Sequence, residues 1–337
     1  MKRLDYYWYR RSPWLLLLTP LSLLFRIVAW LRRFAYRSGL LRSYRISQPV
    51  IIVGNITAGG TGKTPLVIWL AGYLRGKGYR PGVISRGYGG KASSWPQQVR
   101  ADSDPAMVGD EAVLIAAATQ CPMAVGPDRV ATARALIEHS DCDVILSDDG
   151  LQHYALQRDI EIIVIDGVRR FGTGFSIPAG PLREPVRRLK EADLVVINGL
   201  GSGQEHRMRM NPGDVHSLLD DSNTRRLSDF YGQAVHAVAG IGNPERFFQL
   251  LQQQGMQLEK HAFPDHYQYT SADIRFGDIK PVIMTEKDAV KCRHFATEND
   301  WYIPVTVQMS PDFCQQLDEL LEDRVDRKTQ TGICSRQ

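Results

Sequence analysis

Short apolar runs alternate with helical patterns over most of the chain. Each run is compact and apolar, which is typical of a buried strand; the predicted strands cover residues 50–53, 83–84, 144–146, 160–165 and 194–197. Residues 65–74 have a helical pattern, and residues 111–119 are Ala-rich and also helical. Strands that alternate with helices predict an α/β fold, in which a mostly parallel sheet is flanked by helices on both faces.

An apolar stretch near the N-terminus, residues 14–31, is interrupted by Pro20 and Arg26. A helix that spans a bilayer needs about 20 apolar residues, and a central arginine costs about 2.5–3.5 kcal/mol. A secretory signal is disfavoured, because arginines follow the stretch and no small-residue cleavage site does. We therefore favour an amphipathic, membrane-associated helix that lies on the bilayer surface. A spanning helix and a buried core helix are the alternatives.

The charge of the chain is unevenly distributed. Residues 1–45 carry ten Lys and Arg against one acid, a charge of +9, whereas the whole chain of 337 residues carries +4. The remainder is mildly acidic, which argues against nucleic-acid binding. Arginines and aromatic residues in the leader suit anionic headgroups. The five cysteines form no CxxC pair, so neither disulfides nor a zinc knuckle is expected.

These patterns divide the chain into five parts. Residues 1–45 are the membrane-associated leader, and residues 46–200 are the main α/β domain. Residues 201–233 are polar, so we interpret them as a linker. An α/β pattern returns at residues 234–323 and predicts a second, smaller domain, and residues 324–337 form a polar tail.

The sharpest motif is GNITAGGTGKTP at residues 54–65. It follows an apolar strand and opens a helix, as a P-loop does. Its glycines let backbone N–H groups close around phosphate oxygens, Lys63 can reach the β- and γ-phosphates, and Thr64 can ligate Mg²⁺. The general consensus has Gly at the position of Thr57. The predicted nucleotide-binding residues are Thr57, Ala58, Gly59, Gly60, Thr61, Gly62, Lys63 and Thr64.

The stretch at residues 143–149 contains the predicted strand 144–146 and ends in two acids, Asp148 and Asp149. We predict that Asp148 holds Mg²⁺ directly or through water, with Asp149 close behind it. An ordinary Asp-Asp-Gly turn is the alternative. Gln152 and His153 follow within one helical turn and are further site candidates, although His153 fits a structural histidine equally well.

A loop rich in turn residues, residues 171–185, ends in a charged pair. Loops of this kind cover phosphate sites, so Arg183 and Glu184 are candidates for contacts with phosphate and metal. An ordinary rigid loop is the alternative interpretation.

Two further residues are ambiguous by pattern alone. Asp110 precedes the Ala-rich helix and looks first like its N-cap, a role that is compatible with a catalytic carboxylate. His266 follows a proline turn, where a surface or core histidine is the ordinary interpretation. Residues 285–288, Thr-Glu-Lys-Asp, lack the Lys-x-Asp spacing of the guanine motif and so do not predict GTP binding.

Together these motifs resemble one family, the tetraacyldisaccharide 4′-kinases. The matching stretches are GNITAGGTGKTP (54–65), SRGYGG (85–90), VGDE (108–111), SDDGLQH (147–153), PAGPLREP (178–185), FPDH (263–266) and TEKDAVK (285–291). SDDGLQH and PAGPLREP are far more specific than the P-loop. The apolar, arginine-rich leader also fits this family.

The resemblance implies an enzyme that uses ATP and Mg²⁺. Its acceptor is a tetraacylated glucosamine disaccharide 1-phosphate, a lipid A precursor, phosphorylated on the 4′-hydroxyl at the cytoplasmic face of the bacterial inner membrane. The resemblance makes Asp110 the carboxylate that takes the hydroxyl proton and His266 its partner. Asp148, Asp149 and Glu184 would form the acidic metal group. No protein or nucleic-acid partner is expected.

The competing interpretation is a membrane-recruited P-loop switch ATPase of the partitioning type. GGTGKT is similar to the loop of that class, but the lysine that precedes its glycine pair is replaced here by Ala58. Such a protein would dimerise with nucleotide and make no lipid product.

Overall fold

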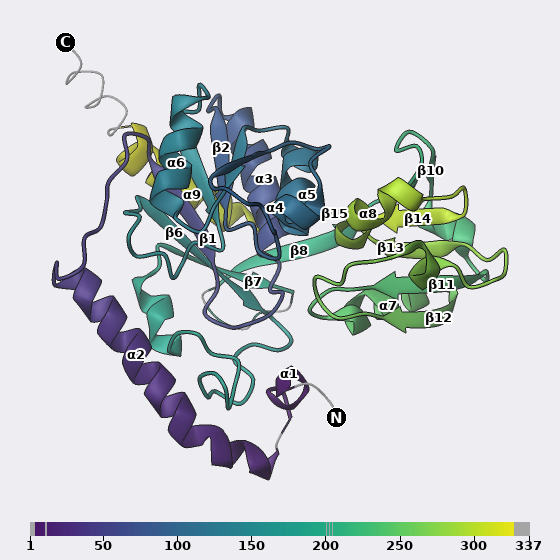
Figure 1. The fold of residues 1–337 in the computed structure, drawn as a ribbon, viewed down its shortest axis with the longest axis horizontal. Coiled ribbons are helices and arrows are strands. Elements are labelled where there is room, and N and C mark those ends of the chain that lie inside the picture. The colour runs from purple at the N-terminus through teal and green to yellow at the C-terminus, as the bar shows by residue number, and fades with distance from the viewer. Residues whose placement is uncertain (1–3, 11, 200, 202, 204, 327–337) are drawn as a thin grey trace.

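The computed structural model describes residues 4–10, 12–199, 201, 203 and 205–326. In this part of the chain two β-sheets form a larger and a smaller α/β domain, which lie side by side in Figure 1. The fold predicted from the sequence, a mostly parallel sheet flanked by helices with a second α/β domain, is confirmed.

The larger sheet has nine strands over the described residues, in the order β15-β8-β7-β6-β1-β5-β2-β4-β3. Its central strands are parallel, and β3 and β15 pair antiparallel at the two edges. The strands are β1 Val50–Gly54, β2 Pro81–Ser85, β3 Gln97–Val99, β4 Met123–Val125, β5 Val144–Asp148, β6 Ile160–Asp166, β7 Leu194–Asn198, β8 His206–Pro212 and β15 Val305–Met309.

Helices cover both faces of this sheet. Because side chains of a strand alternate between the two faces, each central strand contacts both helical layers. Ile51 and Val53 of β1 pack against one helical layer, and Val50 and Ile52 pack against the other. The first layer consists of α3 Lys63–Gly76, α5 Asp110–Thr119 and α9 Pro311–Leu320, and the second contains α6 Arg129–Glu138. Buried on both faces, the central strands read as continuous apolar runs, which is why the sequence reveals them.

The smaller sheet has the order β10-β9-β14-β13-β11-β12 within the described residues. Its strands are β9 Val215–Ser217, β10 Thr224–Arg225, β11 Ala234–Ala239, β12 Gln257–Ala262, β13 Val282–Thr285 and β14 Asp300–Ile303. Strands β11, β12, β13 and β14 are parallel to one another. The helices of this domain are α7 Pro244–Gln253 and α8 Glu286–Cys292.

The interpretation of residues 201–233 as a linker is wrong. It contains β8, which extends the larger sheet, and β9 and β10, which belong to the smaller one. The predicted smaller domain also ends too late, because β15 pairs with β8 and α9 packs on the larger sheet. The chain thus passes between the two domains twice, after β8 and again before β15, which pair with each other (Figure 1). Of the predicted tail, residues 327–337 lie outside the described part, and residues 324–326 belong to a π-helical turn, Leu321–Asp326.

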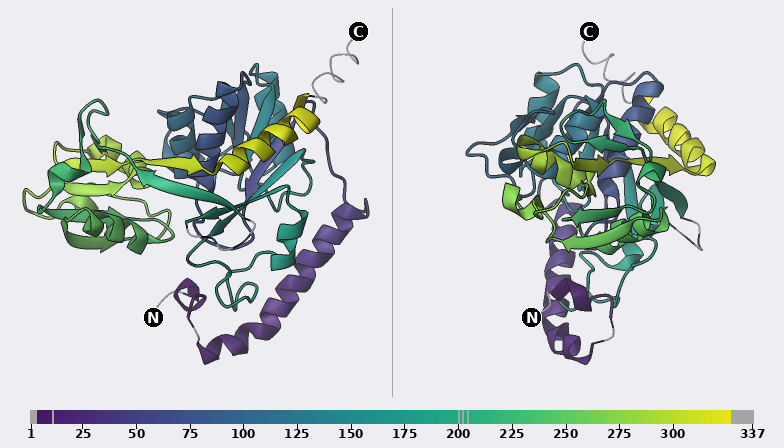
Figure 2. Two further views of the ribbon diagram at one scale, coloured as in Figure 1. Left: turned by 180° about the vertical axis from the view of Figure 1, so that it is seen from behind. Right: turned by 90° about the vertical axis from the view of Figure 1, so that its right-hand side faces the viewer.

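The leader forms α1 Leu4–Tyr7, a 3-10 turn at Pro13–Leu18 and the long helix α2 Thr19–Arg37. Figures 1 and 2 show α2 along the outside of the larger domain. The only buried residue of α2 is Ser22, whose hydroxyl donates to the Ser176 carbonyl at 2.8 Å. The helical stretch Pro13–Arg37 is 25 residues long, contains an 18-residue window with a mean hydropathy of 1.9, and is long and apolar enough to cross a membrane. Its large apolar side chains are mostly exposed, so it is not a core helix.

The shorter elements complete the structure. α4 covers Pro105–Val108, and 3-10 turns cover Val186–Glu191, Leu227–Phe230, Ser271–Ile274 and Arg293–Phe295.

Candidate active site

The predicted P-loop lies between β1 and α3. Gly59 and Gly62 have φ angles of 100° and 97°, a left-handed conformation that favours glycine. The side chain of Asn55 donates to the Gly59 carbonyl and to the Thr61 hydroxyl, both at 3.3 Å, and so fixes the loop from within. Lys63 and Thr64 begin α3, which places the N-terminus of a 14-residue helix at the loop. Such a helix start binds phosphate well.

The two acids at the end of β5, Asp148 and Asp149, lie next to this loop, because Val53 of β1 pairs with Asp148. The Asp148 side chain is 1% exposed, and in the described part of the chain neither of its carboxylate oxygens has a hydrogen-bond partner. Burial raises the pKa of Asp148 to about 7, with a further contribution from the charge of Glu111.

Asp149 is in the opposite electrostatic situation. Its Oδ1 lies 3.4 Å from Lys63 Nζ, and its Oδ2 lies 3.3 Å from Arg183 Nη1. Burial by itself would raise the pKa of Asp149, but Lys63 and Arg183 outweigh it and hold the pKa well below its usual range. Asp149 is therefore always ionised at neutral pH, whereas the ionised form of Asp148 would need a bound cation to stabilise it.

A third acid, Asp110, is brought to this site by α5. It is the first helical residue rather than the N-cap, a position that Gly109 takes with a φ of 95°. Asp110 is 4% exposed, and its Oδ1 lies 2.9 Å from Nδ1 of His266, which the smaller domain supplies. The next residue, Glu111, contributes to the raised pKa of Asp148, so this helix start faces the acids after β5.

The Asp110–His266 contact perturbs both groups. Burial opposes ionisation of Asp110, but the hydrogen bond from His266 and the charge of Lys287 lower its pKa to about 2. Burial would likewise lower the pKa of His266, but the hydrogen bond to Asp110 raises it above its usual value. His266 has a φ of 59°, and its ring packs on Tyr88 with centroids 4.8 Å apart. The imidazole is thus held in one orientation.

Two lysines of α8 complete this cluster and were missed as site residues by the sequence analysis. Lys287 Nζ lies 2.9 Å from Glu111 Oε1, 2.9 Å from Asp265 Oδ1 and 3.9 Å from Asp110 Oδ2. Lys291 Nζ lies 3.6 Å from Asp110 Oδ2. The available signal was the stretch TEKDAVK, which contains both lysines.

Glu184 was expected to join Asp148 and Asp149, and the structure places its carboxylate elsewhere. Its Oε1 accepts from Gln152 at 2.8 Å, and its Oε2 accepts from Tyr154 at 2.7 Å and lies 3.4 Å from Arg188 Nε. Both oxygens are therefore engaged in a separate buried network. Spacing along the chain does not reveal such partners, because Tyr154 and Gln152 reach Glu184 only through the packing of two loops.

His153 is partly buried, and its pKa is lowered to about 4 by burial and by Arg129 and Arg86. It is therefore neutral at pH 7. Arg129 is fully buried, donates to the Asp148 carbonyl at 3.2 Å and thereby supports the strand end that carries the acids.

The smaller domain also contacts the P-loop directly. Arg169 donates to the carbonyl of Gly60 in the loop and, at 3.1 Å, to the carbonyl of Gly242 in the smaller domain. A Cβ atom on Gly242 would lie 2.8 Å from the Gly60 nitrogen, so the two backbones are in close contact. The candidate site is thus assembled from both domains.

Comparison with known proteins agrees with this geometry. The model of the tetraacyldisaccharide-1-P 4′-kinase family matches residues 14–322. Proteins named tetraacyldisaccharide 4′-kinase from Nitrosococcus oceani, Shewanella loihica and Methylobacillus flagellatus are 55%, 51% and 50% identical to the chain, over 96%, 94% and 93% of it and 95%, 96% and 94% of their own lengths.

A solved structure has the same fold. The crystal structure of an apo form of LpxK from Aquifex aeolicus, in complex with ATP, superposes with a TM-score of 0.76 at 26% identity, covering 92% of this chain and 99% of that one. On the family match and these relatives, the chain belongs to the tetraacyldisaccharide-1-phosphate 4′-kinase family.

Proposed function

We propose that the chain transfers the γ-phosphate of ATP to the 4′-hydroxyl of a tetraacyldisaccharide 1-phosphate, and that the site described above performs the transfer. Membership of the family supports the reaction. The observation that supports the assignment of the site is the buried Asp148 carboxylate, which has no hydrogen-bond partner among the described residues. Its neighbour Asp149 pairs with the P-loop lysine Lys63, and the pKa of Asp148 is raised by burial and by Glu111, the residue next to the Asp110 that pairs with His266.

The P-loop holds the triphosphate in this proposal. Backbone N–H groups of residues 57–64 and the helix dipole of α3 bind its oxygens, and Lys63 reaches the β- and γ-phosphates. Lys63 is at present held by Asp149 at 3.4 Å. This salt bridge keeps the ammonium at the loop, and Arg183 on the other side of Asp149 adds a second cation near the transferred group.

Asp148 and Thr64 would hold Mg²⁺. The buried Asp148 carboxylate has a pKa of about 7 because little around it stabilises its negative charge. A divalent cation would supply the positive charge that stabilises the ionised form. Carboxylate and hydroxyl oxygens are hard donors of the kind that Mg²⁺ prefers. When bound, Mg²⁺ neutralises charge on the phosphate oxygens during transfer. Glu184 is left out of this set because its oxygens are engaged by Gln152 and Tyr154.

Asp110 and His266 would orient the acceptor hydroxyl and take its proton. The 4′-oxygen forms a bond to the γ-phosphorus, the bond from that phosphorus to the bridging oxygen of ADP breaks, and the proton leaves to the pair. A carboxylate whose pKa is about 2 is too acidic to keep the proton, whereas His266 has a raised pKa and can. Asp110 then acts chiefly by orienting the imidazole and stabilising its charged form.

The leader would hold the enzyme at the cytoplasmic face of the inner membrane. The exposed apolar face of α2 suits the acyl region of a bilayer. A cavity of about 360 Å³ lies between α2 and the loop at residues 174–187; its lining includes Leu23, Phe175 and Val186 together with Arg26 and Arg187. We propose that an acyl chain of the acceptor enters there. The same loop contains Arg183, so it connects the membrane side to the phosphate site.

The test is to incubate the full chain in detergent micelles with γ-labelled ATP and the disaccharide acceptor, and to analyse the lipid. We expect label in the lipid, and none with an acceptor that lacks the 4′-hydroxyl. Release of free phosphate without labelled lipid would refute the kinase and favour the switch ATPase. The His266→Gln variant is the matched control for enzyme-dependent transfer.

A further inference from the structure

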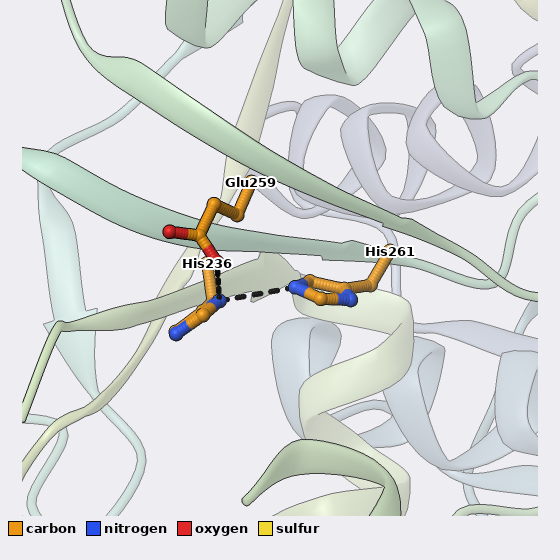
Figure 3. A group of neighbouring side chains, drawn as sticks. All are labelled: His236, Glu259 and His261. Atoms are coloured by element: carbon orange, nitrogen blue, oxygen red, sulfur yellow. Dashed lines mark hydrogen bonds and ion pairs between the residues drawn. The ribbon is translucent and has the colours of Figure 1, made fainter. Parts of the chain in front are cut away.

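A second cluster of ligand-type side chains lies in the smaller domain and shares no residue with the proposed kinase site. His236 lies on β11, and Glu259 and His261 lie two residues apart on β12 (Figure 3). The parallel register pairs His236 with Glu259 and Val238 with His261. Because side chains alternate along a strand, Glu259 and His261 project from the same face as His236. The sequence analysis did not single out any of the three.

The donor atoms of this cluster converge. Nδ1 of His236 lies 3.0 Å from Nε2 of His261 and 3.4 Å from Oε2 of Glu259, as the dashed lines in Figure 3 indicate. All three donor atoms lie within 4.8 Å of one another. Tetrahedral ligands about 2.0–2.1 Å from a zinc ion are separated by about 3.3–3.4 Å. The spacing from His236 to Glu259 already matches this value, and the two imidazole nitrogens, 3.0 Å apart, would have to separate slightly.

His236 is oriented for metal binding by a fourth residue. Its Nε2 lies 3.0 Å from Oδ1 of Asp278, and the imidazole is 2% exposed. A neutral imidazole that donates its Nε2–H to a carboxylate has its lone pair on Nδ1, which here points toward His261 and Glu259. Metal-bound histidines commonly have such a carboxylate behind them. The ring of Phe276 stacks on both imidazoles, at centroid distances of 4.1 Å from His236 and 3.9 Å from His261, and so fixes both planes.

We propose that His236, Glu259 and His261 bind a divalent transition-metal ion of the zinc type, with Asp278 as the outer carboxylate. Two imidazoles and one carboxylate favour zinc and its neighbours over Mg²⁺ or Ca²⁺, which prefer oxygen ligands. The fourth ligand would be water, since Glu259 is half-exposed. That exposure also leaves room for the Glu259 side chain to move and close the remaining spacing.

The charge of the cluster suits a divalent cation. Lys280 Nζ lies 2.5 Å from Glu259 Oε1 and 2.7 Å from Asp278 Oδ2, so it neutralises one of two carboxylates. With both imidazoles neutral, one negative charge remains beside the paired nitrogens. Lys280 occupies the oxygen of Glu259 that faces away from His236, and the other oxygen stays available to the metal.

A metal at this site would link β11 and β12, the two strands that lead to the proposed kinase site. β12 is an edge strand, and His261 lies one residue before its end; the chain then reaches His266 within four residues of Ala262. β11 ends at Ala239, shortly before Gly242 contacts the P-loop. A metal that bridges β11 to β12 therefore stabilises the base of both segments. This role is structural and does not depend on which phosphate acceptor the enzyme uses.

The experiment is titration of the full chain in detergent micelles with Co²⁺, a spectroscopic substitute for zinc, in the presence of excess Mg²⁺ to occupy oxygen-ligand sites. We expect one equivalent to give the intense visible bands of a low-coordinate ion, without thiolate charge-transfer bands, and Zn²⁺ to displace it. His261→Gln and Glu259→Gln should each weaken binding about tenfold or more. His294→Gln, which removes an exposed histidine of the same domain, should leave the titration unchanged.

Zn²⁺ should also raise the unfolding temperature of the unaltered chain and of His294→Gln, because a ligand that binds only the folded state stabilises it. The proposal is overturned if Co²⁺ gives only the weak spectrum of an octahedral ion, or if the bands persist in His261→Gln. If His261→Gln does not fold, the half-exposed Glu259→Gln decides the question alone. A kinase that transfers phosphate normally but shows no Co²⁺ bands would refute this inference and leave the proposed function intact.

Discussion

Replacing Asp148 with Asn is expected to stabilise the ligand-free protein at alkaline pH and to abolish its turnover. The carboxylate is 1% exposed and has no hydrogen-bond partner among the described residues, and burial raises its pKa from 3.8 to about 7. A raised pKa in the folded state means that the protein is relatively most stable below pH 3.8 and loses that stability as the pH rises to about 7. Asn cannot ionise and so escapes this loss.

The size of this stability effect follows from the raised pKa of Asp148. Between pH 5 and 7 Asp148 is protonated in the folded chain and ionised in the unfolded chain, and each pH unit in that interval lowers the free energy of unfolding by about 1.4 kcal/mol. The difference in unfolding free energy between Asp148→Asn and the unaltered chain should therefore rise by about 2–3 kcal/mol from pH 5 to pH 8. Other groups titrate in both proteins and cancel in this difference.

The assay is urea unfolding of both proteins in micelles with EDTA, at pH 5 and pH 8. Asp149→Asn is the matched control: the pKa of Asp149 is lowered by Lys63 and Arg183, so its effect should not change between these pH values. Mg²⁺ added at pH 8 should stabilise the unaltered chain and not Asp148→Asn. An Asp148→Asn difference that is equal at pH 5 and pH 8 would refute the claim that this carboxylate is desolvated and unpaired.

Three further variants test other parts of the structure. His266→Gln should lower kcat about 10²- to 10⁴-fold with little change in the KM for ATP. Because the pKa of His266 is raised, the activity of the unaltered enzyme should fall on the acid side with a midpoint above pH 6.5, and this fall should be absent in the variant. An equal rise in the KM for ATP would indicate a structural role. Deletion of residues 1–45 should abolish sedimentation with vesicles of anionic lipid, and undiminished sedimentation would contradict the membrane role of the leader. Gly242→Ala should lower both activity and the free energy of unfolding, the latter by about 1–3 kcal/mol, because its Cβ would lie 2.8 Å from the Gly60 nitrogen. Gly72→Ala is the control for chemical unfolding and should be neutral or slightly stabilising, because in the described part of the chain no atom outside its own helical turn lies within 4 Å of the new Cβ.

The P-loop was predictable because its information is local. A buried strand, glycines, a lysine and a helix start follow one another within residues 50–76, and the positive φ angles of Gly59 and Gly62 agree with that sequence. The acids after β5 were predictable for the same reason. β8 was missed because only one of its seven residues is buried, so its polar composition resembles that of a linker.

The grouping of residues in the proposed active site could be found only from the tertiary structure. Asp110 and His266 are 156 residues apart and come from different domains, and the pattern alone left both with ordinary structural interpretations. Lys287 was set aside with a motif that did not fit GTP, yet α8 carries it into contact with Glu111. Glu184 shows the converse: its neighbour in sequence contacts Asp149, but its own oxygens are engaged by other partners.

The sequence by itself therefore determined the elements whose identity depends on neighbours along the chain: the strands, the phosphate loop, the amphipathic leader and the acids that end β5. Tertiary structure alone decided which charged groups meet, because packing brings together residues from distant segments. It also decided how strongly they are perturbed, because desolvation acts on a carboxylate such as Asp148 only once the fold has removed it from water.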